Sequence, residues 1–285
     1  MKRCLRCDTV FEGADWGCPA CRARPSEDRF VRFVDGDKPA DFPQASFSLL
    51  AGLEERSFWF RARNTIVLAA IRRHAPQPRS FFELGCGTGF VLRGVSRAFP
   101  DARLVGGELA AEGLEIARER VPTATLIQVD GRRIPYRDEF DLIGAFDVLE
   151  HIEEDEAVLA ELRAALDPQG RLILTVPQHP WLWSAADDFG EHKRRYTRTE
   201  LVGKLQRNGL DVAYVTSFMT TLLPLMAVSR WRQRDVRSFD PAQELQISPR
   251  IDRLLERVAG TERHAVERGI SLPAGGSLLA VARRA

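Results

Sequence analysis

The chain has 285 residues, of which 44% are hydrophobic and 28% charged, a composition that excludes a disordered or collagen-like protein. Its formal net charge of +1 gives no overall electrostatic attraction to nucleic acid or to an acidic membrane. No stretch approaches the roughly 18 apolar residues of a membrane span, and the first residues lack the apolar core of a signal peptide. We therefore expect a cytoplasmic protein with one α/β domain and a smaller module.

The first 25 residues contain four of the five cysteines, in two CxxC pairs separated by ten residues. Each pair can direct two sulfurs at one metal from a single tight turn, and two such turns complete the tetrahedral four-sulfur site that Zn2+ favours. The predicted ligands are Cys4, Cys7, Cys18 and Cys21. Because this site has no open position, the zinc is expected to be structural, in a zinc-ribbon-like module over residues 1–25. Two disulfides or bound iron are the alternatives.

Residues 26–45 contain acids and three prolines around a short apolar piece, residues 30–34, which predicts a linker with one strand. Residues 46–75 have the apolar spacing of a helix, and Pro76 and Pro78 end that run.

Strands and helices then alternate. The expected strands are residues 81–84, 103–107, 125–129, 140–146, 171–176, 211–217 and 277–282, and the expected helices are residues 91–99, 110–120, 154–166 and 198–208. Because the strands are almost continuously apolar, they predict a mostly parallel sheet that helices cover on both faces, a Rossmann-like doubly wound α/β fold.

The first of these strands leads into ELGCGTG, residues 83–89, in which three glycines alternate with other residues before a helix begins. Glycines allow the backbone to approach a ligand closely, and a helix N-terminus offers free N–H groups. The GxGxG spacing differs from the GxGxxG fingerprint of dinucleotide sites. Glu108 follows the next strand, where a carboxylate can bind both ribose hydroxyls. The sequence therefore predicts a nucleotide-type site.

These segments together resemble the class I S-adenosylmethionine-dependent methyltransferases. The resemblance rests on ELGCGTG (83–89), GGEL (106–109), QVDGRRIPY (128–136) and FDLIGAFDVLEHI (140–152), in this order. It covers roughly residues 46–217 and the last strand, and it implies a seven-stranded sheet whose last strand is antiparallel. We expect a methyltransferase domain over residues 46–285, with a substrate-side insertion around residues 218–275.

The resemblance also implies which residues bind S-adenosylmethionine. Glu83 and the glycine backbone would hold the methionine part, Glu108 the ribose, and Asp130 with the next N–H group the adenine, while the segment after the fourth strand would line the methionine end. The implied set is Glu83, Gly85, Gly87, Gly89, Glu108, Leu109, Asp130, Gly131, Asp147, Val148 and Leu149. Ordinary surface or turn positions are the alternative for each acid.

Candidates for the acceptor side come from three segments. His151 and His192 are the candidate catalytic bases, which an acceptor arriving protonated would need. The candidate substrate contacts are Trp59, Arg61, His179, Trp181, Arg195 and Tyr196. The arginines and the tyrosine suit a phosphate or carboxylate. A helix cap, a solvated basic turn and core aromatics are the plain alternatives.

Residues 218–231 carry no charge before Arg230, which favours a buried helix kinked at Pro224. Contact with a membrane surface through Arg230, Arg232 and Arg234 is the alternative. The predicted function is methyl transfer to a small-molecule or lipid-like acceptor, a class that includes anionic molecules. The first alternative is an RNA methyltransferase that grips nucleic acid with its zinc module. A cofactor-binding protein without catalysis is a further one, and the sequence gives no indication of oligomeric state.

Overall fold

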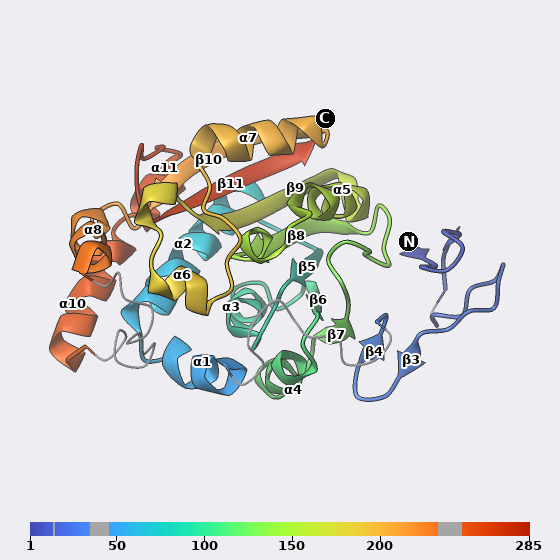
Figure 1. The fold of residues 1–285 in the computed structure, drawn as a ribbon. Coiled ribbons are helices and arrows are strands. Elements are labelled where there is room, and N and C mark those ends of the chain that lie inside the picture. Colours follow the sequence, from blue (N-terminus) through green and yellow to red (C-terminus); the bar gives the residue numbers. More distant parts are fainter. Residues whose placement is uncertain (14, 35–45, 233–246) are drawn as a thin grey trace.

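The computed structural model describes residues 1–13, 15–34, 46–232 and 247–285. Its centre is a twisted sheet between two layers of helices (Figure 1). The sheet has the order β10-β11-β9-β8-β5-β6-β7-β4-β3. Its seven central strands are β5 (Ser80–Leu84), β6 (Arg103–Glu108), β7 (Thr125–Gln128), β8 (Phe140–Phe146), β9 (Leu166–Pro177), β10 (Leu210–Phe218) and β11 (Ser277–Arg284).

The chain direction in these strands confirms the predicted fold. Strands β7, β6, β5, β8 and β9 pair in parallel, whereas β11 is antiparallel to both of its neighbours, β9 and β10. The strand order reverses at β5, which lies between β6 and β8. In open α/β sheets, ligands bind beyond the carboxyl ends of the strands at such a switch point. The glycine turn follows β5 and therefore lies there.

Helices cover the sheet on both faces. They are α1 (Ser46–Glu54), α2 (Phe58–His74), α3 (Phe90–Ala98), α4 (Ala111–Arg120), α5 (Asp155–Ala165), α7 (Arg198–Arg207), α10 (Pro249–Gly260) and α11 (Arg263–Arg268). Along β5, Phe81 packs with α2 and α3, and Phe82 packs with α5 on the opposite face. This alternation is the two-residue period of a strand that is buried on both sides.

Two predicted helical segments differ from the structure in detail. Residues 46–75 form α1 and α2, because Ser57 caps a new helix by accepting a hydrogen bond from the Trp59 N–H at 3.3 Å. Helix α8 (Leu223–Arg232) begins beside Pro224, so the proline lies in the first turn and does not kink the helix.

Helix α8 is only partly buried. Met226 packs against the core, but the side chains of Leu225 and Val228 are 57% and 48% exposed. Arg234, assigned to the membrane surface in the alternative interpretation, lies outside the described residues. Across the described ranges, no helix combines the length and the apolar character needed to cross a membrane.

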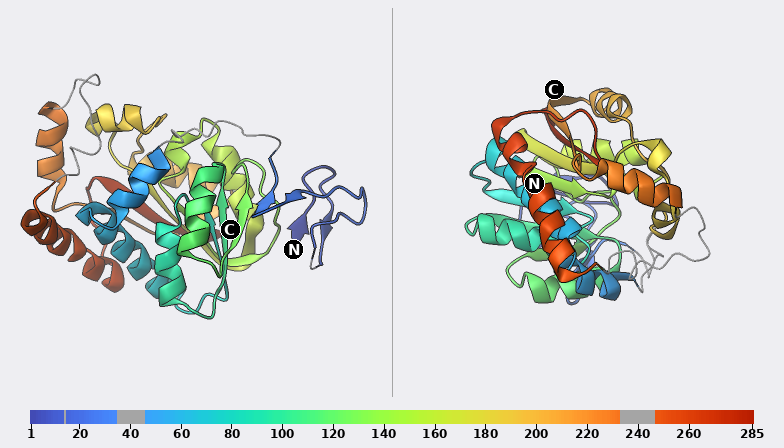
Figure 2. Two further views of the ribbon diagram at one scale, coloured as in Figure 1. Left: turned by 90° about the horizontal axis from the view of Figure 1, so that it is seen from below. Right: turned by 90° about the vertical axis from the view of Figure 1, so that its left-hand side faces the viewer.

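The N-terminal segment contains the short antiparallel pair β1 (Lys2–Arg3) and β2 (Val10–Phe11). In Figure 2 it lies at one end of the molecule, opposite α10 and α11. Two further strands, β3 (Ser26–Glu27) and β4 (Val31–Arg32), follow it, and β4 extends the central sheet by pairing with β7. The predicted strand near residues 30–34 is thus confirmed. The rest of the predicted linker, residues 35–45, lies outside the described residues.

Candidate functional site

A cavity of about 400 Å³ lies at the carboxyl ends of the central strands. Its walls come from the segments after β5, β6, β7 and β8, from α1, α2 and α8, and from the loop before α7. The described residues of the N-terminal module do not line it. The cavity therefore lies where the strand order predicts a ligand site.

The glycine turn lines the cavity with backbone atoms. Its conformation requires residues without side chains. Gly85, Gly87 and Gly89 have φ values of 67°, 50° and 76°, in the left-handed region that favours glycine. A Cβ atom on Gly85 would lie 2.4 Å from Val148. Gly85 and Gly87 line the cavity, whereas Gly89 starts α3 and packs against Ala117.

Glu108 connects this turn to the next strand. Its Oε2 accepts a hydrogen bond from the Gly87 N–H at 3.0 Å, and its Oε1 accepts from the Leu109 and Ala110 N–H groups at 2.8 and 3.0 Å. Burial raises the pKa of the Glu108 carboxyl, which these hydrogen bonds lower only in part. The side chain faces the cavity at the position expected for a ribose ligand.

Asp130 and Gly131 also line the cavity, after β7. The carboxylate of Asp130 forms a two-point ion pair with Arg132, at 2.9 Å to Nε and 2.7 Å to the terminal nitrogen. Arg132 is a cavity residue that the sequence analysis did not select, although RR follows the VDG segment directly.

Another residue missed in the sequence is Arg63. It is only 7% exposed, forms an ion pair with Asp147 at 2.8 Å, and lies 5.4 Å from the centre of the Trp59 ring. Glu83 is buried at the same end of the cavity, and burial raises its pKa well above the usual value although Arg63 lowers it. A positive φ of 56° at Asp147 directs this segment into the cavity wall.

Arg61, selected in place of Arg63, lies elsewhere. Its guanidinium contacts Asp252 at 2.5 Å and Glu256 at 2.7 Å, both on α10, and it is not among the cavity residues. Residues two apart on a helix point in nearly opposite directions, so only one of these two arginines can face the cavity. Trp59 does line it.

His151 and His192 lie together in the cavity wall, with ring centres 4.7 Å apart. A hydrogen bond of 2.7 Å from the Lys193 N–H to the Glu150 carbonyl holds the two segments side by side. The Glu150 side chain, which the sequence analysis did not select, is completely buried in the same wall. Arg195 also lines the cavity, and its Nε donates a hydrogen bond to Asp187 at 2.8 Å.

Four other predicted residues do not line the cavity. Tyr196 is fully buried, and its hydroxyl donates a hydrogen bond to Asp155 at 2.7 Å. Trp181 is 62% exposed and its ring packs against His179, with centres 5.3 Å apart. Leu149 is buried in the core. None of these side chains is among the residues that line the cavity.

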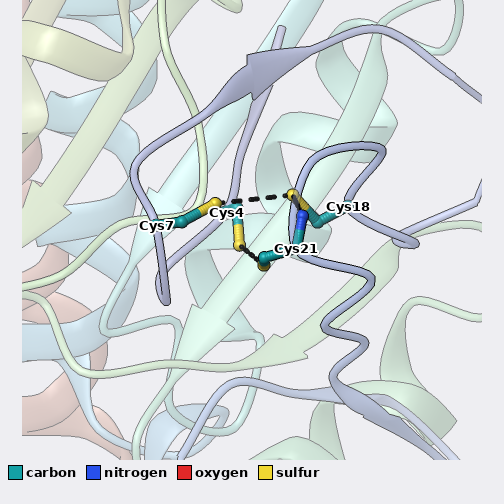
Figure 3. Close-up of side chains that lie close together, drawn as sticks. All are labelled: Cys4, Cys7, Cys18 and Cys21. Carbon is teal, nitrogen blue, oxygen red and sulfur yellow. Dashed lines mark hydrogen bonds between the residues drawn. The ribbon is translucent and has the colours of Figure 1, made fainter.

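The side chains of Cys4, Cys7, Cys18 and Cys21 point toward one another (Figure 3). The Cys4 and Cys21 sulfurs are 3.6 Å apart, as are those of Cys7 and Cys18. A tetrahedral site with Zn–S bonds of about 2.3 Å places its sulfurs about 3.8 Å apart, whereas a disulfide needs about 2.05 Å. The four thiols are free, and their spacing fits a four-thiolate metal site.

Residues 82–174 match the family model described as a methyltransferase domain. This segment of the chain is similar to that family. This finding confirms the resemblance to S-adenosylmethionine-dependent methyltransferases and covers the glycine turn, Glu108, Asp130 and Asp147.

Curated relatives resemble the methyltransferase domain over part of their length. The chain is 27% identical to a malonyl-[acyl-carrier protein] O-methyltransferase of Halalkalibacterium halodurans, over 53% of this chain and 56% of that one. It is 35% identical to a trans-aconitate 2-methyltransferase of Paracidovorax citrulli, over 34% and 38% of the two chains. The chain thus spans about half the length of the first of these relatives and less than half of the second.

Solved structures share the fold. The complex between the Haloferax volcanii Trm112 methyltransferase activator and its methyltransferase contains a chain that is similar with a TM-score of 0.57. The identity is 18%, and the similarity covers 85% of this chain and 96% of that one. The likeness extends well beyond residues 82–174, so the fold around the methyltransferase domain is shared as well.

Proposed function

We propose that the protein is an S-adenosylmethionine-dependent methyltransferase that acts on a small-molecule or lipid-like acceptor of anionic type. The observation that carries the proposal is the joint geometry of the glycine turn and Glu108. The glycine turn, which has no room for side chains, faces the cavity. The Glu108 carboxylate at the end of the next strand faces the same cavity, and the Gly87 N–H donates a hydrogen bond to it.

The residues at this end of the cavity fit the cofactor. Glu108 would hold the ribose hydroxyls, and the backbone of residues 85–88 would hold the methionine part beside Asp147. Asp130 and the Gly131 N–H would face the adenine. The bound cofactor supplies a methyl group on a positively charged sulfur. The protein contributes positioning, which can lower a barrier by about 7–11 kcal/mol when the acceptor is held in line.

The opposite end of the cavity suits an acceptor with negative charge. Arg195 and Arg230 lie in its walls, with Met226 and other apolar side chains beside them. His151 or His192 would accept the proton of an acceptor that arrives protonated. The relatives named for malonyl-[acyl-carrier protein] and trans-aconitate support an acidic acceptor.

We further propose the division of the chain. Residues 1–25 would form a structural Zn2+ module held by the four cysteines, residues 26–45 a connection, and residues 46–285 the methyltransferase domain. Met226 and Arg230 from the 218–275 segment line the cavity, which supports a substrate-side role for this insertion.

The test is transfer of label from methyl-labelled S-adenosylmethionine to cell extract separated into small-molecule, lipid and RNA fractions. We expect label in the small-molecule or lipid fraction with the wild-type protein and, at a cofactor concentration below saturation, much less label with the Glu108→Gln variant. Label that enters only RNA would support the nucleic-acid alternative and refute the proposed acceptor class. Cofactor binding without transfer to any fraction would refute the enzymatic activity.

A further inference from the structure

Three potential metal ligands from two segments meet at the acceptor end of the cavity. Glu150 and His151 belong to the short helix η1 (Leu149–His151), and His192 follows α6 (Ala185–Phe189). One ligand atom of each lies within 4.8 Å of the others. The group is separate from the four-cysteine cluster, which lies in the N-terminal module.

We propose that Glu150, His151 and His192 bind a divalent metal ion, which in turn binds an oxygen atom of the acceptor. Two imidazoles and one carboxylate are a ligand set that suits Zn2+, Fe2+ and Mn2+. Three protein ligands leave positions open for water or substrate, as in catalytic sites and unlike the closed four-cysteine cluster. The metal site is argued from geometry alone, whereas its role rests on the proposed methyl transfer.

The burial of Glu150 is the first independent observation. Its side chain is 0% exposed, and among the described residues neither carboxylate oxygen has a hydrogen-bond partner. A buried carboxylate without a partner is strongly unfavourable, and a bound cation removes that cost. The neighbouring arginines pair with other acids, Arg63 with Asp147 and Arg195 with Asp187, each at 2.8 Å.

The orientation of His192 is the second observation. Its Nδ1 lies 2.9 Å from Asp187 Oδ1, so this nitrogen carries the proton and Nε2 has a free lone pair. A ligand histidine held by a carboxylate at its other nitrogen is the usual arrangement around bound metals. Asp187 is itself fixed, because the Ser184 N–H, the Ser184 hydroxyl and Arg195 also donate hydrogen bonds to it.

The proposed site narrows the class of acceptor. Hard divalent cations bind oxygen donors, and a hydroxyl bound to such a cation releases its proton to solvent more readily, so that with a metal bound the two histidines would act as ligands and not as bases. An acceptor with a hydroxyl or carboxylate oxygen therefore fits better than one with a soft sulfur.

The experiment uses Mn2+ as the probe, in the 285-residue chain with zinc on its cysteines. Mn2+ prefers nitrogen and oxygen ligands and binds thiolates weakly, so it reports on this site alone. Electron paramagnetic resonance titration counts bound Mn2+, and water-proton relaxation reports whether bound water still exchanges. We expect one Mn2+ per chain with exchangeable water.

Two variants and one control make the test specific. Glu150→Gln and His192→Ala each remove a ligand and should weaken Mn2+ binding by about 10-fold or more. His264→Ala is the matched control, since His264 is exposed on α11, where its ring pairs with Glu267 of the same helix. S-adenosylhomocysteine binding, measured in parallel, shows that each variant keeps the cavity intact.

The outcomes separate the two proposals. Failure to bind Mn2+, or equal affinity in the wild type and both variants, would overturn the metal site. Bound Mn2+ without exchangeable water would overturn the acceptor role. If Mn2+ binds as expected but S-adenosylhomocysteine does not, the metal site stands and the proposed methyl transfer fails.

Discussion

Glu108 shapes the candidate site through its hydrogen bonds and is also the residue that we propose to bind the ribose. Its three backbone hydrogen bonds fix the glycine turn relative to the start of α4 (Ala111–Arg120) before any ligand binds. Truncation to alanine would therefore disturb the turn as well as remove the ribose ligand. A change to glutamine keeps the size of the side chain and removes the charge, so it tests the ribose contact more cleanly.

We expect Glu108→Gln to weaken S-adenosylhomocysteine binding by about 10-fold or more, because hydrogen bonds to a charged group contribute roughly 1.5–3 kcal/mol. Isothermal titration calorimetry measures the affinity, and thermal unfolding checks that the fold is kept. Glu112→Gln is the control, because Glu112 lies at an exposed position in the first turn of α4. This variant should bind S-adenosylhomocysteine with normal affinity. Unchanged affinity in Glu108→Gln would place the ribose elsewhere.

Glu83 should make stability depend on pH. Burial raises its pKa well above the usual 4.5, with Glu54 and Glu108 adding to the effect and Arg63 opposing it. The folded state therefore binds more protons than the unfolded state above about pH 4.5, and the free energy of unfolding falls as the pH rises. Glu83→Gln removes this dependence because the amide does not ionise.

The stability of Glu83→Gln relative to the wild type should consequently increase with pH, by up to about 1.4 kcal/mol per pH unit. Urea unfolding of both proteins between pH 5 and pH 8 measures the difference. Groups remote from Glu83 titrate equally in the two proteins, so the difference between the curves reports Glu83 together with its coupling to Glu54 and Glu108. Parallel pH curves would show that Glu83 is charged in the folded protein.

Arg61 and Arg63 show where inference at the level of residues fails. Both lie in FRARN, and both could reach an anion, so their types do not distinguish them. The register of α2 (Phe58–His74) decides, because it turns Arg63 to the cavity and Arg61 to Asp252 on α10. A helical period predicts that they diverge, but only packing shows which one faces the ligand.

At the scale of elements, the segment between β9 and α7 has two parts with different tasks. Asp187, His192 and Arg195 form one hydrogen-bonded unit in the cavity wall. Tyr196 instead anchors the end of the segment on α5 through Asp155, which also pairs with Lys204 and Arg194. The hydrogen bonds from Lys204 and Tyr196 outweigh the opposing effect of burial and lower the pKa of Asp155.

Tyr196→Phe should therefore reduce stability without affecting ligands. The lost hydrogen bond is expected to lower the free energy of unfolding by about 1–2 kcal/mol, and the phenyl ring preserves the packing. Urea unfolding gives the stability, and calorimetry with S-adenosylhomocysteine gives the affinity, which should not change. A variant with normal stability and weaker binding would restore the substrate role that the sequence suggested.

At the scale of the whole molecule, the N-terminal segment packs against α5 and against the residues that precede β8. Trp16 is buried with Phe33 and Tyr136, at ring-centre distances of 4.7 and 5.4 Å. Arg3 binds Glu161 on α5 at 2.9 Å, and its N–H donates to the Pro135 carbonyl at 3.0 Å. The module contributes to the core while lying away from the cavity.

Release of the thiolate-bound metal should therefore disturb this contact. A mercurial reagent that attacks thiolates is expected to release one Zn2+ per chain, after which hydrogen exchange rises in residues 1–34 and in the facing residues 133–137. S-adenosylhomocysteine affinity should persist. Release of no zinc or of two ions per chain would contradict the four-thiolate site, and exchange that rises throughout would mean that the module folds as one unit with the domain.

The sequence by itself determined the order of elements, the glycine turn, the acid after the second strand and the four clustered cysteines. These are local features, because strand period, turn conformation and ligand spacing depend on neighbours in the chain. Only the tertiary structure decided that Arg63 faces the cavity, that Tyr196 is buried, and that Glu150 meets His192 from a segment about 40 residues away. Contacts between residues far apart in the sequence depend on the order of the strands in the sheet and on where the loops cross the ends of the strands. No local sequence pattern specifies either of these.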